Sequence, residues 1–418
     1  MRAIFIAVGS ELLDLDRIDT NSILAARMLR ERGVLLDMKL VVGDTLDHIA
    51  WAIKKACQRA QVVIVSGGLG PTDDDLTREA VSTALGRELV YREETTERIR
   101  QVFRQRGIPM PDINQRQAFF LDGAEELENK VGTAPGQFID LEHCKLFLLP
   151  GPPVELEPML TAAIEKYVAP EAHFFIYQRR FKLAGISESE ADARMAPLYR
   201  RYRNPQTTIL AAPGGIELHL LGRSKNTVDE AKQLTDELAD KIAAEMAGYI
   251  FTQGDETLEQ VVMRELLAQG RTVAVAESCT GGLLGGRLTA VPGSSQGFLG
   301  GVIAYADEVK RDVLGVPAEL LEKHGAVSAQ VAKAMAHGVR RLTGAGIGVA
   351  ITGVAGPGGG TSDKPVGRVY FHLSDGDREV PFSVLLGGTR ELIRARTVTS
   401  ALDQLRRFLT VPLEPRHS

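Results

Sequence analysis

The stretch TVAVAESCTGG, residues 272–282, decides the fold of the C-terminal part of the chain. Its short apolar run at residues 273–276 predicts a buried strand, and Gly281 and Gly282 then open a helix. A strand that runs into a helix start presents backbone N–H groups, which suit an oxyanion or a phosphate. The turn itself carries a carboxylate, two hydroxyls and a thiol, on Glu277, Ser278, Thr280 and Cys279. We therefore expect a nucleophile at this turn.

Two further predicted strands end in reactive groups. The strand at 301–306 supplies Tyr305, with Lys310 five residues later, and the strand at 348–352 supplies Thr352 before a glycine-dense loop that begins at Gly353. In a parallel sheet these strand ends lie on one edge, so the groups can converge with Ser278. Because no histidine stands in these motifs, the base for a serine nucleophile would be Lys310, or Tyr305 acting beside it. Burial favours a neutral lysine amine, which can accept a proton.

Anion-binding groups are also expected near this turn. Thr280 and the N–H groups of Gly281 and Gly282 are candidates to hold an oxyanion or a phosphate. Arg390 and Arg394 stand at the start of the last predicted helix, four residues apart and so on one face, and are candidate phosphate anchors.

Simpler interpretations of the same residues remain open. A serine at a strand–helix turn is more often a helix cap than a nucleophile, and Cys279 can be a small buried apolar residue. Tyr305 can end its strand with a solvated hydroxyl, Lys310 can be an exposed helix residue, and Glu277 can be a capping or surface acid.

The N-terminal part alternates predicted strands with predicted helices. Strands are expected at 4–8, 36–42, 62–66 and 144–149, and helices at 20–32, 46–60 and 155–167. This rhythm is typical of a doubly wound parallel sheet, which binds ligands at the carboxyl ends of its strands.

A glycine-rich and acidic loop follows the third of these strands. Gly67, Gly68 and Gly70 allow phosphates to approach the backbone, and the next polar residues are Asp73, Asp74 and Asp75. Carboxylates beside such glycines suit a divalent cation that bridges a diphosphate, although three aspartates are also common in a solvated turn or helix cap.

We predict three domains, over residues 1–169, 170–252 and 253–412. The fold class is α/β, with an N-terminal doubly wound sheet, a small α+β middle domain and a C-terminal α/β domain. The middle domain shows no catalytic cluster and is interpreted as a spacer or oligomerisation unit, its helix near 187–201 opening with the capping sequence Ser187-Glu188-Ser189-Glu190.

Composition excludes several classes of function. A net charge of −5 and a pI near 6.0 show no excess of the basic residues with which proteins bind polyanions, so direct nucleic-acid binding is not expected. Three cysteines without CxxC spacing fit a reducing cytosol, and no histidine cluster in the sequence completes a zinc site. No apolar stretch is long enough for a membrane span, so we expect a cytoplasmic protein.

The C-terminal motifs resemble one known family. The segments AESCTGG at 276–282, AYADEVK at 304–310 and TGVAGP at 352–357 are similar to the C-terminal domain of the CinA (competence/damage-inducible protein A) family. That resemblance implies nicotinamide mononucleotide deamidase activity, with Ser278 as nucleophile and Tyr305 and Lys310 as its activating partners. The family tyrosine is usually followed by Ser-Asn or Thr-Asn, whereas this chain has Ala306-Asp307.

The N-terminal loop resembles the same family, whose N-terminal domain has a molybdopterin-binding-like fold. Matching segments include GSELL at 9–13, DTN at 19–21, NQRQA at 114–118, NKVGTAPG at 129–136 and LPGPP at 149–153. The resemblance implies metal-dependent hydrolysis of ADP-ribose to AMP and ribose 5-phosphate. It makes Asp74 and Asp75 the best metal candidates, with Asp73 third. Other implied nucleotide contacts are Glu11, Asp19, Asn21, Asn114, Gly132 and Thr133, together with the glycines of the loop.

Taken together, the sequence predicts a bifunctional hydrolase of pyridine nucleotide salvage. It implies a divalent metal of unknown identity for the N-terminal domain, no cofactor for the C-terminal deamidase, and a homo-oligomer, expected to be a dimer. Two alternatives remain. In the first, the N-terminal domain binds molybdopterin or transfers adenylyl groups to it, and a pterin-binding module would leave ADP-ribose intact. In the second, the chain is a non-enzymatic scaffold in DNA uptake or recombination.

Overall fold

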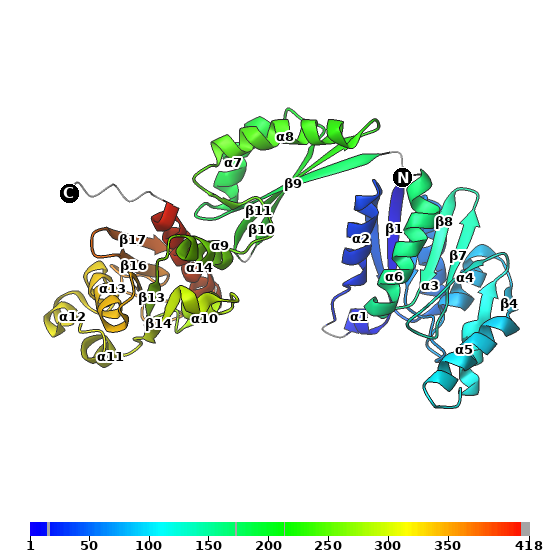
Figure 1. Cartoon of the computed structure of the whole chain (residues 1–418), viewed down its shortest axis with the longest axis horizontal. Coiled ribbons are helices and arrows are strands. Elements are labelled where there is room, and N and C mark those ends of the chain that lie inside the picture. Colours follow the sequence, from blue (N-terminus) through cyan, green and yellow to red (C-terminus); the bar gives the residue numbers. More distant parts are fainter. Residues whose placement is uncertain (15–16, 172–173, 213, 411–418) are drawn as a thin grey trace. The chain divides into compact units, whose positions relative to one another are not determined.

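The computed structural model describes residues 1–14, 17–171, 174–212 and 214–410. They form two compact units, which are described separately: Met1–Tyr177 with Gly222–Gln233, and Gln178–Leu221 with the residues from Leu234 on. Both contain helices and sheets with parallel strands, so the predicted α/β class is confirmed (Figure 1). The three domain boundaries stay predictions, and residues 411 and 412 of the third lie outside the described residues.

The first unit is built on a six-stranded sheet of order β2-β1-β3-β8-β7-β6. Its first four strands run parallel, and β7 and β6 continue it as antiparallel strands. The central strand β3 is buried on both faces, which explains its unbroken run of apolar residues. The strands are β1 (Arg2–Val8), β2 (Leu35–Val42), β3 (Val62–Ser66), β6 (Glu125–Leu127), β7 (Gly136–Leu141) and β8 (Cys144–Leu149).

Helices cover both faces of this sheet (Figure 1). One face packs on α2 and α6, and the other on α3 and α4, with a separate apolar core on each side. Their bounds are α2 (Asn21–Glu31), α3 (Leu46–Cys57), α4 (Thr77–Leu85) and α6 (Pro153–Ala163). The remaining elements are α1 (Glu11–Asp14), α5 (Glu93–Gln105), η1 (Asp112–Ala118), η2 (Ile164–Val168), η3 (Ala169–Glu171) and the two-stranded sheet of β4 (Leu89–Tyr91) with β5 (Phe119–Leu121).

A four-stranded sheet of order β10-β11-β9-β12 follows, with α7 and α8 packed on it. Ser187 caps α7 as predicted, because its hydroxyl accepts the N–H of Glu190 at 3.2 Å. The elements are β9 (Phe175–Leu183), α7 (Glu188–Tyr199), β10 (Gln206–Ala212), β11 (Gly215–Ser224), α8 (Val228–Glu245) and β12 (Ile250–Thr252).

The C-terminal sheet has five strands in the order β14-β13-β15-β16-β17. Strands β14, β13 and β15 are parallel, whereas β16 and β17 form an antiparallel hairpin at the other edge. The strands are β13 (Val273–Glu277), β14 (Phe298–Ile303), β15 (Ile347–Gly353), β16 (Arg368–Ser374) and β17 (Glu379–Leu385).

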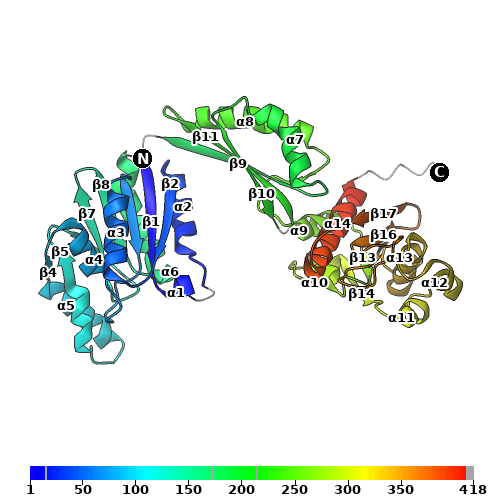
Figure 2. The same ribbon diagram turned by 180° about the vertical axis from the view of Figure 1, so that it is seen from behind.

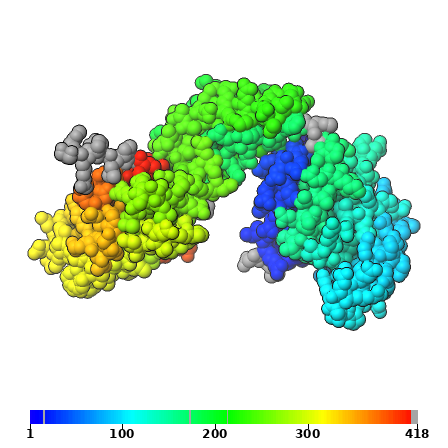
Figure 3. Space-filling model, viewed as in Figure 1, coloured from blue at the N-terminus to red at the C-terminus, as the bar shows by residue number. Residues whose placement is uncertain are grey.

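Two helical layers enclose this sheet, as the view from behind also shows (Figure 2). One face packs on α9 (Leu258–Ala268), α10 (Leu283–Thr289) and α14 (Arg390–Thr410). The other packs on α13 (Ala329–Thr343). Beside α13 lie α11 (Asp307–Asp312) and α12 (Ala318–His324), which form the yellow surface in Figure 3, while η4 (Ser294–Gln296) precedes β14.

Candidate functional site

Ser278 stands where three parallel strands end. Its N–H donates to the carbonyl of Ile351 in β15 at 3.0 Å, while the N–H of Ala304 after β14 donates to the carbonyl of Glu277 at 2.7 Å. These bonds place Ser278 level with Thr352 and next to the β14 end that leads to Tyr305. The predicted convergence of the three strand ends is confirmed. The Ser278 side chain is 9% exposed, and none of the described residues makes a hydrogen bond with its hydroxyl.

The Glu277 carboxylate organises the turn after Ser278. It is 1% exposed and accepts the N–H groups of Gly282 at 3.1 Å, Leu284 at 3.1 Å and Gly285 at 2.8 Å. It therefore caps the start of α10, where backbone N–H groups have no partner within the helix. Of the two simpler interpretations of Glu277, the capping one is correct.

The capping geometry changes which groups of the turn are free. The N–H of Gly281 donates to the Ser278 carbonyl at 3.1 Å and the N–H of Gly282 donates to Glu277. This arrangement does not support the expected anion-binding role of these two amides, because both are already hydrogen-bonded. Both glycines instead have positive φ, 59° and 93°, which side chains rarely adopt. Among the described residues, neither the N–H nor the buried hydroxyl of Thr280 has a partner, so Thr280 is the better candidate.

Lys310 is buried, with 1% of its surface exposed, contrary to the simpler interpretation of an exposed helix lysine. Its Nζ donates to the backbone carbonyl of Tyr305 at 3.2 Å and to Oδ1 of Asp307 at 3.1 Å. These bonds fold the lysine side chain back toward the end of β14. Asp307 is thus a direct partner of the candidate base.

Tyr305 is 59% exposed, and its hydroxyl accepts a hydrogen bond from Arg390 at 2.8 Å. The same guanidinium donates to the carbonyl of Gly356 in the glycine-dense loop at 2.7 Å. Arg394, one turn later on α14, donates to the carbonyls of Cys279 at 3.1 Å and Thr280 at 2.8 Å. The two arginines share a face as predicted, but both hold the strand ends together rather than standing free as phosphate anchors.

Three other candidates of this domain have structural roles. The buried Thr352 hydroxyl donates to the carbonyl of Ala326 at 2.8 Å. A Cβ on Gly353 would lie 2.8 Å from the Val369 side chain, so glycine permits close pairing with β16. Cys279 is buried, and this burial raises the pKa of its thiol to about 11. A thiol with so high a pKa is a poor nucleophile at neutral pH.

In the first unit, hydrogen bonds from two side chains of α4 hold the backbone carbonyls of the glycine-rich loop. The Thr77 hydroxyl donates to the carbonyl of Gly67 at 2.8 Å. The guanidinium of buried Arg78 donates to the carbonyls of Leu69 and Gly70, both at 2.7 Å, and burial lowers its pKa. With its carbonyls turned toward these groups, the loop keeps one conformation around the cavity above it.

The three aspartates have different environments. Asp75 accepts the N–H of Gly70 at 2.8 Å and that of Thr72 at 2.9 Å, so its carboxylate shapes the loop. Asp73 is exposed and pairs with Arg116 at 3.0 Å. Asp74 is also exposed, and a hydrogen bond with Thr72 lowers the pKa of its carboxyl. Asp74 is therefore the candidate with the most carboxylate capacity left for a metal.

A cavity of about 350 Å³ lies over this loop, at the carboxyl ends of β1 and β3. Its lining includes the predicted residues Glu11, Gly67, Gly68, Gly70, Asp74, Asp75 and Thr133. It also includes three polar residues that the sequence analysis missed, Asp44, Gln117 and Glu155. Asp44 follows β2 and Glu155 follows the Pro-Gly-Pro-Pro segment after β8. Their position after strands was the signal that could have found them.

Other predicted nucleotide contacts lie around this cavity. Glu11 also lines a neighbouring cavity of about 530 Å³, together with Asp19 and Asn21. Asn21 Nδ2 donates to the carbonyl of Gly151 at 2.7 Å, while its buried Oδ1 has no partner among the described residues. Gly132 lines a third cavity with Thr133. Buried Asn114 is not in the lining of any of these cavities, and its amide donates to Gln117 at 3.2 Å.

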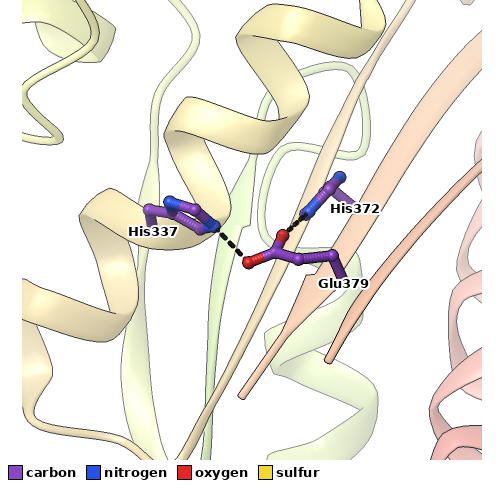
Figure 4. A group of neighbouring side chains, drawn as sticks. All are labelled: His337, His372 and Glu379. Carbon is purple, nitrogen blue, oxygen red and sulfur yellow. Dashed lines mark hydrogen bonds and ion pairs between the residues drawn. The ribbon is translucent and has the colours of Figure 1, made fainter. Parts of the chain in front are cut away.

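The fold brings together possible metal ligands that the sequence pattern does not reveal. The sequence shows no histidine cluster, but His337, His372 and Glu379 lie together between α13 and the β16–β17 hairpin (Figure 4). The two histidines are 35 positions apart in the sequence, so only the packing of the helix on the hairpin brings them together.

In the part of the chain that the structure describes, no helix is long and apolar enough to cross a bilayer.

Comparisons with known proteins cover nearly the whole chain. The family model "Probable molybdopterin binding domain" matches residues 4–170, "Damage-inducible protein CinA KH domain" matches 178–252, and "CinA C-terminal domain" matches 255–409. A "CinA-like protein" of Koribacter versatilis is 44% identical over 419 residues, covering 98% of this chain and 100% of that protein. Another, of Solibacter usitatus, is 41% identical over 411 residues, covering 98% and 99%.

Solved structures match part of the chain. The competence/damage inducible protein CihA from Agrobacterium tumefaciens is 41% identical, covers 35% of this chain and 91% of that chain, and has a TM-score of 0.35. The competence damage-inducible protein A (ComA) from Klebsiella pneumoniae is 36% identical, covers 37% of this chain and 97% of that chain, and has a TM-score of 0.37.

Proposed function

Because this chain belongs to the CinA family, we propose that its C-terminal domain hydrolyses the carboxamide of nicotinamide mononucleotide, with Ser278 as the nucleophile. The observation that carries the proposal is the meeting of three strand ends. They place Ser278 beside the segment that holds Tyr305 and the buried Lys310. A serine, a buried amine and a tyrosine hydroxyl at one sheet edge are the parts that a serine–lysine hydrolase needs.

In the proposed reaction, the Ser278 hydroxyl bonds to the carboxamide carbon and its proton passes to the Lys310 amine. The C–N bond then breaks, and the amide nitrogen leaves as ammonia with that proton. Water hydrolyses the resulting ester, which releases nicotinate mononucleotide and restores the Ser278 hydroxyl. The positive charge of the pyridinium ring makes the carboxamide carbon more electrophilic and so favours attack by Ser278. Amide hydrolysis involves no change of oxidation state, so the proposed steps need no redox cofactor.

Other groups at this edge would support the same steps. Tyr305 accepts a hydrogen bond from Arg390, so its own O–H remains able to donate to a substrate oxygen. The unpaired N–H and hydroxyl of Thr280 are suited to the oxyanion of the tetrahedral intermediate. Arg394 holds the carbonyls of Cys279 and Thr280 and so keeps the turn in place.

The test uses the full chain and nicotinamide mononucleotide, with ammonia and nicotinate mononucleotide both measured. We expect the two products to form at equal rates and to be unaffected by a chelator. A folded preparation that forms neither product would contradict the proposal.

A second activity, hydrolysis of ADP-ribose to AMP and ribose 5-phosphate, is proposed for the N-terminal domain. The favouring observation is one cavity that combines a glycine-rich loop with the carboxylates of Asp74, Glu11, Asp44 and Glu155. Glycines admit a pyrophosphate close to the backbone, and carboxylate oxygens are the donors that Mg²⁺ prefers. A divalent ion bound there would neutralise the pyrophosphate and lower the pKa of an attacking water.

The residues of this cavity have separable roles in that proposal. Asp74 and Glu11 would bind the cation, whereas Asp75 is already hydrogen-bonded within the loop and would keep it in shape. Asp74→Asn is expected to lower ADP-ribose hydrolysis at least about tenfold, since single changes around a metal site cost that much. The matched control is Asp73→Asn, because the adjacent Asp73 pairs with Arg116 and is not in the lining.

The two activities should respond differently to metal removal. A chelator should abolish formation of AMP and leave ammonia release intact. Equal loss of both activities would contradict the assignment of two independent sites, and ADP-ribose left intact with Mg²⁺ or Mn²⁺ present would favour a pterin-binding module instead.

A further inference from the structure

The second unit contains a group of three side chains outside the proposed hydrolase site. His337 comes from the middle of α13, His372 from β16 and Glu379 from the first position of β17. Three separate elements thus contribute one side chain each, and all three side chains point toward one another (Figure 4).

The nitrogen and oxygen atoms of this group converge. His337 Nε2 lies 2.8 Å from Oε1 of Glu379, and His372 Nε2 is hydrogen-bonded to the other oxygen, Oε2. The candidate ligand atoms all lie within 4.8 Å of one another. Tetrahedral Zn²⁺ with bonds of about 2.0–2.1 Å to nitrogen needs ligand atoms roughly 3.3 Å apart, a spacing that lies within the 4.8 Å limit on the distances in this group.

The surroundings hold the carboxylate and the buried ring in place. Glu379 pairs with Ser374 across the hairpin, and the Ser374 hydroxyl donates to Glu379 Oε1 at 2.9 Å. His372 is 2% exposed, and its Nδ1 has no partner among the described residues, so Glu379 is its hydrogen-bond partner. A hydrogen bond to a ligating carboxylate is the kind of outer support that metal sites use.

A hydrogen-bonded histidine and glutamate alone would be an ordinary structural pair. This chain contains such a pair at His219 and Glu217, at 3.3 Å. What differs here is the second histidine, brought by α13 to the opposite oxygen of the same carboxylate. Lys333, one turn earlier on α13, is exposed and adds a smaller unfavourable charge near His372.

We propose that His337, His372 and Glu379 bind one divalent transition-metal ion, with Zn²⁺ as the best fit, and that this ion ties α13 to the β16–β17 hairpin. Imidazole nitrogen suits Zn²⁺ and its first-row neighbours, and two histidines with one carboxylate leave a fourth position for water. On binding, the proton that each Nε2 shares with the carboxylate passes to Nδ1 of the same ring or to solvent, and Nε2 then bonds to the ion.

The site is separate from the Ser278 turn. Glu379 pairs with Ser374, which is level with Gly348, whereas Ser278 is level with Thr352. Four strand positions correspond to roughly 13 Å along the sheet at about 3.3 Å per residue. Metal at this site is therefore expected to affect stability rather than the proposed amide hydrolysis.

The test measures metal binding by the full chain after dialysis against a chelator. Zn²⁺ is titrated calorimetrically, and Co²⁺ is used as a spectroscopic probe of tetrahedral nitrogen ligation. The variants are His337→Ala, which removes a partly exposed side chain, and Glu379→Gln, which replaces a partly exposed carboxylate by an amide of the same shape. His219→Ala is the matched control, and Asp74→Asn removes the candidate metal ligand of the N-terminal cavity.

The wild-type chain is expected to bind Zn²⁺ at a site that both ligand variants weaken at least about tenfold, as loss of metal-site groups does. His219→Ala and Asp74→Asn should leave this binding unchanged, and His337→Ala should still release ammonia from nicotinamide mononucleotide. The proposal is overturned if Zn²⁺ does not bind, or if it binds the wild-type chain and His337→Ala equally.

Discussion

The Nζ atom of Lys310 lies 3.1 Å from Oδ1 of Asp307, although the lysine is 1% exposed. The two residues lie three positions apart on the same helix, so the carboxylate fixes the position of the amine. In the proposed reaction this amine accepts the Ser278 proton, which makes Asp307 a candidate positioning residue for the base.

The first prediction concerns this hydrogen bond. Asp307→Ala removes one of the two acceptors that hold the Lys310 Nζ atom, so we expect kcat for ammonia release from nicotinamide mononucleotide to fall about tenfold as the amine loses its position. The measurement is kcat and KM for ammonia release. Asp312→Ala is the control, because Asp312 lies on the same helix and pairs with Arg311 instead. An unchanged kcat in Asp307→Ala would show that Asp307 does not position the base.

The second prediction concerns the cap of α10. Glu277→Gln leaves one oxygen for three N–H groups, so at least one buried donor loses its partner. We expect a loss of stability of about 1–3 kcal/mol, the usual cost of such a group, seen as a lower midpoint of thermal unfolding for the C-terminal domain. Glu308→Gln, an exposed change on α11, should leave that midpoint unchanged. Equal midpoints for both variants would show that the cap contributes little.

The third prediction concerns the positioning of Tyr305. Arg390→Lys cannot reproduce the fork that joins the Tyr305 hydroxyl to the Gly356 carbonyl. We expect kcat for ammonia release to fall at least about tenfold with little change in KM, because the misplaced hydroxyl would act mainly in the transition state. Arg396→Lys is the control, since the Arg396 guanidinium donates to the Gly387 carbonyl instead. A change in KM alone would assign Arg390 to substrate binding.

The fourth prediction concerns thiol reactivity. Burial raises the pKa of Cys279 to about 11, so its thiolate is scarce at neutral pH and increases as the pH approaches that value. Alkylation of Cys279, followed by peptide mapping, should therefore be slow at neutral pH and accelerate in alkali. Cys57 is partly exposed, and a hydrogen bond from Cys144 lowers its pKa, so it should react first. Faster labelling of Cys279 at neutral pH would indicate an activated thiol.

The strand ends of the candidate site could be predicted from the sequence because parallel pairing follows from local patterns. Apolar runs and glycines mark β13 and β15, and parallel pairing then puts Ser278 level with Thr352. The sequence left two interpretations of Glu277 open, a capping acid and a surface acid, and residue spacing does not distinguish them. The distinction depends on where the N–H groups of α10 point, which is a property of the folded turn.

Features that depend on packing between distant segments were not predictable in this way. The burial of Lys310 depends on how α11 packs on the rest of its domain. The meeting of His337 with His372 depends on the packing of α13 over β16. The different environments of Asp74 and Asp75 likewise depend on the folded loop. The loop directs the Asp75 carboxylate toward the N–H groups of Gly70 and Thr72, both of which belong to the same loop.

The most direct test of the central claim compares Ser278→Ala with Cys279→Ala in release of ammonia from nicotinamide mononucleotide. The two residues are adjacent, and each change removes one candidate nucleophile. The account predicts that Ser278→Ala loses nearly all activity, by at least about a hundredfold, whereas Cys279→Ala stays close to the wild-type rate. Near-normal ammonia release by Ser278→Ala would contradict the account.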